Sequence, residues 1–249
     1  MNINKVFTDF CNALSQRTRP LTEDNIRYYW FANMLKQDSD LNHYCLEEQY
    51  NPNLCNALSP GQAELDLHYE GGTSVLGSND GTANFCFEMK LHRFTGSTLT
   101  YTENVGKVLN DLRRLNAITL SGSRKLFLYV TDGAMEAHLL KATAGINSFP
   151  TYRSQVSGLF SLSLNQTISL TFSASQVPAT FWREAAKSVP IPHPASSFSL
   201  NLELLDSATI PCPAASSTVP CPAPIQAAGS TPAPTSQSQF LHIRLFEVK

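Results

Sequence analysis

Alternating apolar and polar positions predict two neighbouring β-strands in the first half of the chain. In residues 64–70 every second residue is leucine or tyrosine and the others are polar or charged, which is typical of a half-buried strand. Residues 84–93, NFCFEMKLHR, show the same alternation with larger apolar side chains. The segment between them, residues 71–83, is rich in glycine and contains an Asp-Gly pair, which is a hairpin signal. We therefore expect the two strands to pair across a long hairpin.

Apolar residues spaced by three and four positions predict two helices, one before and one after this hairpin. Residues 21–36 begin with Thr22, whose hydroxyl is a suitable N-cap, and Glu23 and Asp24 suit the positive end of the helix dipole. Two apolar stripes on this helix predict that it is largely buried. Residues 101–118 form the second helix, whose apolar stripe consists of Val105, Val108, Leu109, Leu112 and Leu115.

The following part of the chain mixes strand and helix patterns. Residues 124–132 predict a strongly apolar strand, and residues 133–145 a short helix. Residues 158–174 alternate like strands, and residues 178–188 have helical spacing. This order of elements predicts an α/β fold with a central mixed β-sheet flanked by helices.

Composition changes sharply near the C-terminal end. Residues 206–239 contain many prolines, alanines, serines and threonines and almost no charge, so they cannot bury a core and are expected to form a disordered loop. Residues 240–249, FLHIRLFEVK, again look like a strand, and we expect it to return to the sheet. Residues 1–249 are accordingly expected to form a single domain.

Overall composition is that of a soluble globular protein, with 42% hydrophobic and 15% charged residues. The net charge of −2 lacks the strongly basic balance of many nucleic-acid-binding proteins. Six cysteines form no CxxC pair, and no apolar stretch suits a signal peptide or a membrane span. We expect a cytoplasmic protein in a reducing environment, without membrane contact.

Charges are unevenly distributed along the chain. Residues 37–80 contain eight acids and no lysine or arginine, whereas residues 81–145 contain eight bases and five acids. An acidic cluster beside a basic face can hold a metal ion next to an anionic polymer. Two solvated surfaces of opposite sign are an equally good interpretation of this distribution.

The charged residues within the two hairpin strands suggest a metal site. Glu88 and Lys90 are two positions apart in a strand, so their side chains point the same way. Asp66 lies in the preceding strand and can converge with Glu88 if the strands pair. Two carboxylates suit a hard cation such as Mg²⁺, with Mn²⁺ as a substitute, and the metal can acidify a bound water. The lysine adds a positive charge that stabilises developing negative charge, and Glu23 can complete the site, with Asp24 as its alternative.

The strands ELDL and CFEMK, followed by the helix GKVLNDLRRL and the strand KLFLYVTD, resemble the PD-(D/E)xK nuclease superfamily, which has the restriction-endonuclease-like fold. The resemblance spans roughly residues 20–132. It implies a Mg²⁺-dependent endonuclease that cleaves nucleic acid, DNA in the first place, with a metal-activated water. It assigns the catalytic positions to Asp66, Glu88, Lys90 and Glu23, of which Asp66 and Glu88 bind the metal. Many such enzymes act as dimers, so a homodimer is one expectation by analogy.

Several residues near these positions are candidates for contacting the substrate. The resemblance places three residues of the 101–118 helix, Lys107, Asp111 and Arg114, near the phosphates. Further candidates for substrate binding are Arg113, His92 and Arg93. For the two adjacent arginines, a solvated helix face is the ordinary alternative.

The candidate catalytic residues also have ordinary structural interpretations. Glu88 and Lys90 can form a surface salt bridge along the strand, and Asp66 can simply face solvent. Glu23 can be a dipole partner or pair with Arg27 one helical turn later. The ExK spacing itself is weak evidence, because FEVK recurs at the last strand, where we interpret it as an edge-strand ion pair.

Two departures from the superfamily pattern keep an alternative open. Ala63 and Glu64 precede Leu65 and Asp66 with no proline, and Asp66 and Glu88 are 22 residues apart. A catalytically inactive module of the same fold that binds nucleic acid or a partner protein is therefore the alternative function. A metal-dependent hydrolase of smaller phosphoesters is a third possibility.

Overall fold

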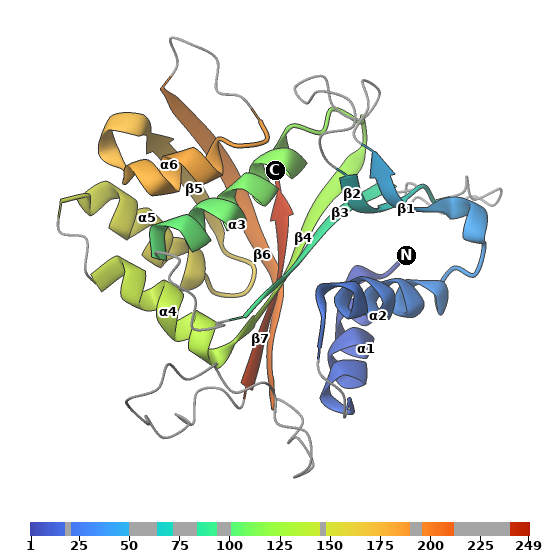
Figure 1. Ribbon diagram of the computed structural model, residues 1–249. Coiled ribbons are helices and arrows are strands. Elements are labelled where there is room, and N and C mark those ends of the chain that lie inside the picture. The colour runs from blue at the N-terminus through green and yellow to red at the C-terminus, as the bar shows by residue number, and fades with distance from the viewer. Residues whose placement is uncertain are drawn as a thin grey trace.

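The computed structural model describes residues 1–17, 21–49, 64–71, 84–93, 101–144, 148–189, 196–211 and 240–249. Its centre is a seven-stranded mixed sheet with the strand order β1-β2-β3-β4-β7-β6-β5. Helices cover both faces of this sheet (Figure 1). The expected α/β architecture with a mixed central sheet is therefore confirmed.

The strands are β1 (Tyr44–Gln49), β2 (Glu64–Tyr69), β3 (Asn84–His92), β4 (Ser123–Asp132), β5 (Thr167–Ser173), β6 (Ser197–Pro211) and β7 (Phe240–Val248). The α-helices are α1 (Ile3–Ser15), α2 (Glu23–Leu35), α3 (Tyr101–Asn116), α4 (Gly133–Ala144), α5 (Pro150–Phe160) and α6 (Ala179–Ala185). Two short 3₁₀ turns, η1 (Leu41–His43) and η2 (Ala174–Gln176), complete the described elements.

Strands β2 and β3 form the expected antiparallel pair, in which Leu67 lies opposite Phe87 and Tyr69 opposite Phe85. Strands β3 and β4 run parallel, with α3 as the connection between them, and the other neighbouring strands are antiparallel. Parallel strands need such a crossover, which explains the strand–helix–strand order of the sequence.

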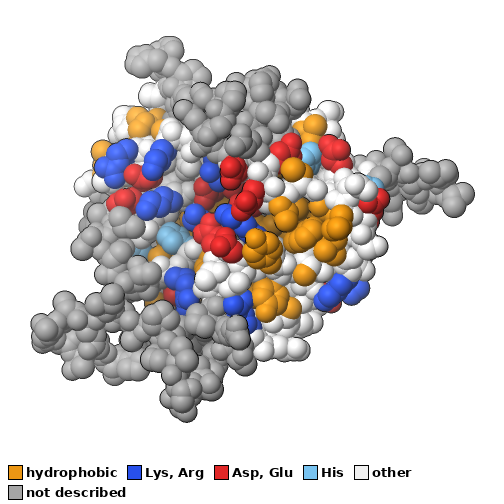
Figure 2. Space-filling model, turned by 45° about the vertical axis from the view of Figure 1, so that its right-hand side comes forward, with side chains coloured by type: hydrophobic (Ala, Val, Ile, Leu, Met, Phe, Trp, Pro, Cys, Tyr) orange, Lys and Arg blue, Asp and Glu red, His pale blue; other side chains and the backbone are white. Residues whose placement is uncertain are grey.

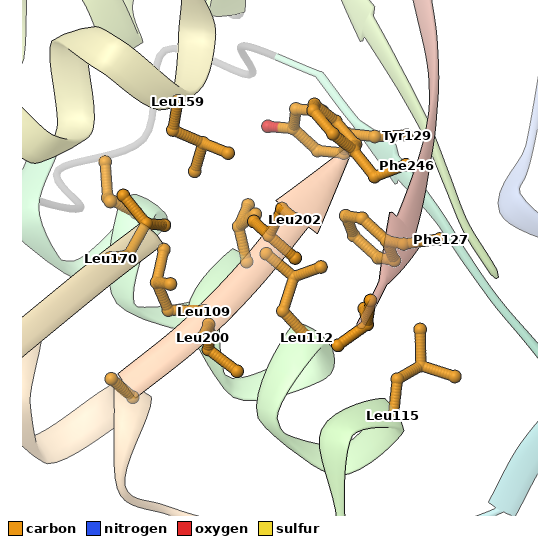
Figure 3. Packing of buried hydrophobic residues seen from close by; sticks show 14 of the residues in the cluster. Leu109, Leu112, Leu115, Phe127, Tyr129, Leu159, Leu170, Leu200, Leu202 and Phe246 are labelled. Carbon is orange, nitrogen blue, oxygen red and sulfur yellow. The ribbon is translucent and has the colours of Figure 1, made fainter. Parts of the chain in front are cut away.

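Two apolar cores lie on opposite faces of the sheet. Helices α1 and α2 cover one face, and α3 to α6 cover the other (Figure 1). In the second core, the predicted stripe of α3 packs against the sheet, as Leu109, Leu112 and Leu115 show in Figure 3. Burial of this stripe at 0–2% exposure confirms the helical pattern from which it was predicted.

Strand β2 is buried on both faces, contrary to the expectation of a half-buried strand. Asp66 and His68, on its polar side, are only 6% and 5% exposed. Leu65 belongs to the core under α3, whereas Leu67 belongs to the core under α1 and α2. The simple alternation did not reveal this, because the polar side is covered by partners from other elements, Arg27 of α2 beside Asp66 and Glu48 of β1 beside His68.

Helix α2 begins as predicted. The Thr22 side chain accepts a hydrogen bond from the Asn25 backbone N–H, and the Asn25 side chain accepts one from the Thr22 N–H, forming a capping box. Burial is one-sided, with Ile26, Trp30 and Met34 inside. Tyr28 is 60% exposed, so the expectation of a largely buried helix is wrong for the second stripe.

The C-terminal strand β7 lies inside the sheet. It pairs with β4 on one side and with β6 on the other. The prediction that residues 240–249 return to the sheet is confirmed, but the interpretation of this strand as an edge is wrong. Edge positions belong to β1 and β5.

Other differences concern elements that were missed or that have other bounds. Helices α1 and α5 and strands β1 and β6 were not predicted, and residues 158–160 end α5 instead of starting a strand. Residues 206–211 belong to β6, so the expected loop begins later than predicted. The remainder of that loop, residues 212–239, and the expected turn residues 72–83 lie outside the described residues. None of the described helices is long and apolar enough to cross a membrane.

Candidate functional site

The predicted catalytic residues come together where β2 and β3 meet the first turn of α2 and one face of α3. Asp66 is held against β3, since its Oδ2 accepts a hydrogen bond of 2.6 Å from the backbone N–H of Met89. Glu88, the residue before Met89, is 2% exposed. The pairing of β2 with β3 therefore brings Asp66 to the residue next to Glu88.

Lys90 links the two helices to the strand. Its Nζ lies 3.7 Å from Glu23 Oε1 of α2 and 3.8 Å from Asp111 Oδ2 of α3. Glu23 thus reaches the site, whereas its alternative Asp24 is exposed and contacts Arg27. A surface salt bridge between Glu88 and Lys90 does not describe this arrangement, because each has partners on other elements.

Arg114 completes the α3 side of the site. Its Nη2 donates to Glu88 Oε2 at 2.5 Å and lies 3.4 Å from Asp111 Oδ1. Asp111 and Arg114 are three residues apart and therefore on the same face of the helix. This face of α3 therefore contacts both charged residues of β3, Glu88 through Arg114 and Lys90 through Asp111.

Burial dominates the electrostatics of the acids. It raises the pKa of Asp66 to about 6, although the neighbouring Arg27 and the Met89 N–H lower it. Burial likewise raises the pKa of Asp111, against the opposing effect of Arg114 and Lys90. These carboxylates are desolvated, which strengthens their interaction with any cation that reaches them.

Arg27 is a site residue that the sequence indicated only as a partner of Glu23. Its Nη2 lies 3.0 Å from Asp66 Oδ1 and 3.5 Å from Glu23 Oε1. It also contacts Glu47 of β1, which has a φ of +54° in the left-handed region that non-glycine residues rarely adopt. No sequence signal locates this contact, since it depends on how β1 lies beside β2.

Two of the predicted substrate contacts lie near the site, while His92 is engaged within the fold. Lys107 lies on α3 one turn before Asp111 and is partly exposed, 4.0 Å from Glu103. Arg93 donates to the Leu21 carbonyl, just before α2. His92 is hydrogen bonded to Tyr129 and Asn104, and burial lowers its pKa to about 4. His92 is thus better placed to stabilise the fold than to bind an anion.

Arg113 does not face the site. Its guanidinium is buried and donates hydrogen bonds to the carbonyls of Ala185 and Val189, at 2.6 and 2.7 Å. It also stacks over the Phe198 ring at 4.6 Å. Both the expected substrate contact and the alternative of a solvated helix face are therefore unsupported, because α6 covers this side of α3.

The second ExK copy has a different environment. Glu247 forms ion pairs with Arg124 at 2.7 Å and with Lys249 at 2.6 Å, and Lys249 also contacts Glu203. The predicted ion pair is thus present, although on an interior strand. Glu203 of β6, the strand that precedes β7, lies directly opposite Glu247 and shares Lys249 with it, so the second copy also has an acid on a paired strand.

The donor atoms at the site suit a hard cation. Mg²⁺ is commonly held by one or two carboxylates, with waters and substrate oxygens as its other ligands. Asp66 and Glu88 supply such oxygens, but Arg27 and Arg114 contact them in this structure. Within the described ranges, no three His, Cys, Asp or Glu side chains are arranged to hold a metal. Asp66 and Glu88 thus fit the carboxylate part of such a site, and a cation bound there would have to displace the two arginines.

No protein-family model, curated protein or solved structure matches this chain. The geometry of the site is therefore the basis for its functional interpretation. Figure 2 shows acidic and basic side chains intermixed near the middle of one face of the molecule, beside an apolar area.

Proposed function

We propose that the protein is a metal-dependent nuclease with a restriction-endonuclease-like fold, and that it hydrolyses phosphodiester bonds, DNA being the first substrate to test. The observation that supports this proposal is the gathering of Asp66, Glu88, Lys90 and Glu23 from three separate elements. Two buried acids, with a partly exposed lysine and glutamate brought to them by tertiary structure, are characteristic of functional sites.

Each of these side chains has a defined role in the proposal. Asp66 and Glu88 would hold Mg²⁺ or Mn²⁺, and the chemistry that such a metal would supply is a lower pKa of a bound water and polarisation of a phosphoryl oxygen. Lys90 orients the attacking water and stabilises the negative charge that develops on the phosphate. Glu23 and Asp111, at 3.7 and 3.8 Å, fix the position of the lysine.

The α3 face provides contacts for the polymer. Lys107 and Arg114 lie one turn before and nearly one turn after Asp111, so both can reach phosphates next to the cleaved bond. Such contacts position the backbone without reading its sequence. Arg113 is excluded from this role by its buried hydrogen bonds.

The test is cleavage of supercoiled plasmid, linear duplex and single-stranded DNA with Mg²⁺, with Mn²⁺ and with EDTA. We expect metal-dependent cutting that falls at least about 100-fold in Lys90→Ala, because removing one group that stabilises developing charge costs about 10²–10³-fold in rate. Lys249→Ala is the matched control, since it removes the lysine of the second ExK copy. Cutting that persists in Lys90→Ala, or that falls equally in Lys249→Ala, would refute the site.

A binding module without catalysis is the second candidate. Its support is that Arg27 and Arg114 form ion pairs with the two predicted metal ligands. Calorimetric titration with Mn²⁺ separates the two functions. Binding that is lost in Asp66→Ala favours the nuclease, whereas DNA binding without any metal binding favours the module.

A further inference from the structure

Arg27 contacts carboxylates on three elements. Its Nη2 lies 3.0 Å from Asp66 and 3.5 Å from Glu23, while its Nη1 lies 3.4 Å from Asp24 and 3.3 Å from Glu47. One terminal nitrogen therefore points to the site and the other to the surface. A guanidinium suits this position because its donors form a rigid planar fork.

The carboxylates around Arg27 differ strongly in exposure. The side chain of Asp66 is 8% exposed, whereas those of Asp24 and Glu47 are 70% and 60% exposed. Water solvates the two outer carboxylates whether or not Arg27 is near them. Asp66 has no such substitute, and a buried carboxylate without a counter-charge is strongly disfavoured.

We propose that Arg27 and a divalent cation compete for Asp66 Oδ1, so that metal binding and the Arg27–Asp66 ion pair are mutually exclusive. This inference rests on the proposed metal site. Arg27 serves as the counter-charge of Asp66 in the metal-free protein, and on metal binding it moves outward to Asp24 and Glu47. It is thus a positioning residue that keeps the site assembled before the metal arrives.

The geometry allows this exchange without moving the carboxylate. Asp66 Oδ2 stays bound to the Met89 N–H, which fixes the side chain while Oδ1 changes partner. Glu47, the outer partner, lies in β1 between Leu46 and Glu48, which pair with Leu67 and Leu65 of β2. Its left-handed backbone is a local strain of the kind retained at functional sites, and it places the acceptor for Arg27 beside Asp66.

The test is calorimetric titration of Mn²⁺ into the full-length protein, with Arg27→Gln and Lys107→Gln. We expect Arg27→Gln to bind Mn²⁺ about tenfold more tightly than the wild type, equivalent to 1.4 kcal/mol, because the competing cation is gone. Lys107→Gln is the matched control, since it removes one positive charge near the site without touching Asp66. We expect its affinity to change less than twofold.

Thermal unfolding provides a second readout. In EDTA we expect Arg27→Gln to unfold at a lower temperature than the wild type, because Asp66 loses its counter-charge. Saturating Mn²⁺ should then raise the unfolding temperature more in the variant than in the wild type. Arg27→Lys, which keeps the charge but not the fork, should be intermediate in both measurements, and it provides the comparison if Arg27→Gln does not fold.

Three results would overturn the exchange while leaving the metal site intact. They are unchanged or weaker Mn²⁺ binding in both Arg27 variants, an equal gain of affinity in Lys107→Gln, or an equal Mn²⁺-dependent stabilisation of variant and wild type. Wild-type protein that binds no Mn²⁺ would instead overturn the metal-dependent function itself, and the exchange with it. The failures of the two proposals are therefore distinguishable.

Discussion

At the scale of single residues, the environment of each charge decides its role more than its place in a motif. Arg113 and Arg114 are adjacent in the sequence, yet one is buried against α6 and the other contacts Glu88. His92 lies two residues after Lys90 on the same side of β3, yet it belongs to a buried hydrogen-bond network. Residue type and spacing cannot distinguish these cases, because they depend on which helix covers each side chain.

The His92 ring predicts a pH dependence of stability. Its pKa is lowered to about 4, first by burial and further by the charges of Lys90, Lys107 and His138, while the hydrogen bond to Asn104 raises it. The usual value in an unfolded chain is about 6.5, so the unfolded state binds more protons between these two pH values. The neutral His92 ring therefore contributes fully to the free energy of unfolding above about pH 6.5, and this contribution is lost as the pH falls towards 4.

The measurement is urea unfolding of the wild type and of His92→Gln between pH 4 and 7.5. As the pH falls over this range, we expect the free energy of unfolding to decrease by up to about 3 kcal/mol more in the wild type than in the variant. This is on the order of 1.4 kcal/mol per pH unit. Glutamine keeps hydrogen-bonding groups near Tyr129 and Asn104 but does not titrate. If the free energies of unfolding of the two proteins changed with pH in parallel, His92 would not be the group responsible for the loss of stability at low pH.

At the scale of elements, the contact between α3 and α6 holds α3 in place, and with it the site residues Asp111 and Arg114. Asn110 exchanges hydrogen bonds with Ser188, and Thr102 contacts Thr180. Gly106 lies at the closest approach, where an added Cβ would be 2.7 Å from the Phe181 carbonyl oxygen. The absence of a side chain at this position is what lets the two helices pack so closely.

Gly106→Ala is therefore expected to destabilise the protein. Alanine favours a helix by about 1 kcal/mol over glycine, but overpacking against backbone costs about 1–3 kcal/mol, and the second Cβ contact at 2.8 Å to Glu184 adds to it. We expect the free energy of unfolding, measured with urea, to fall by about 1–2 kcal/mol. Gly158→Ala is the control, since its close contact is the mobile end of the Ile168 side chain. An equal or smaller loss in Gly106→Ala than in this control would contradict the packing argument.

At the scale of the whole molecule, the sheet is completed by the last residues of the chain. Strand β7 separates β4 from β6 and contributes Leu241, Ile243 and Leu245 to one core and Phe246 and Val248 to the other. The segment that carries the site and the segment made of α5, α6, β5 and β6 therefore share one sheet only through β7. We therefore expect the free energy needed to open β7 to equal the free energy of unfolding of the whole protein.

Hydrogen exchange followed by mass spectrometry tests this prediction. Residues 241–247 lie in a strand that is paired on both sides, so their amides bond alternately to β4 and to β6. We expect these amides to exchange only through global unfolding, as slowly as those of β4. The edge strand β1 is the internal comparison and should exchange at least about tenfold faster. Exchange of residues 241–247 at the rate of β1 would mean that the C-terminal strand opens independently of the sheet.

Local sequence alone determined much of this protein. The hairpin, the α3 stripe, the cap of α2 at Thr22 and the strand character of residues 240–248 all follow from periodicity and capping, which act between residues close in the chain. The same periodicity placed Glu88 and Lys90 on one side of a strand and predicted that Asp66 would lie beside them. These features need no knowledge of the remaining fold.

Only the tertiary structure decided which charges meet. Arg27 reaches Asp66 because α2 crosses the end of β2, and Arg113 is buried because α6 packs on α3. The interior position of β7 depends on pairing between strands more than a hundred residues apart, which local pattern does not encode. The physical reason is the same in each case, since burial and ion pairing depend on distances in space, and these are set by how the two helical layers close over the sheet.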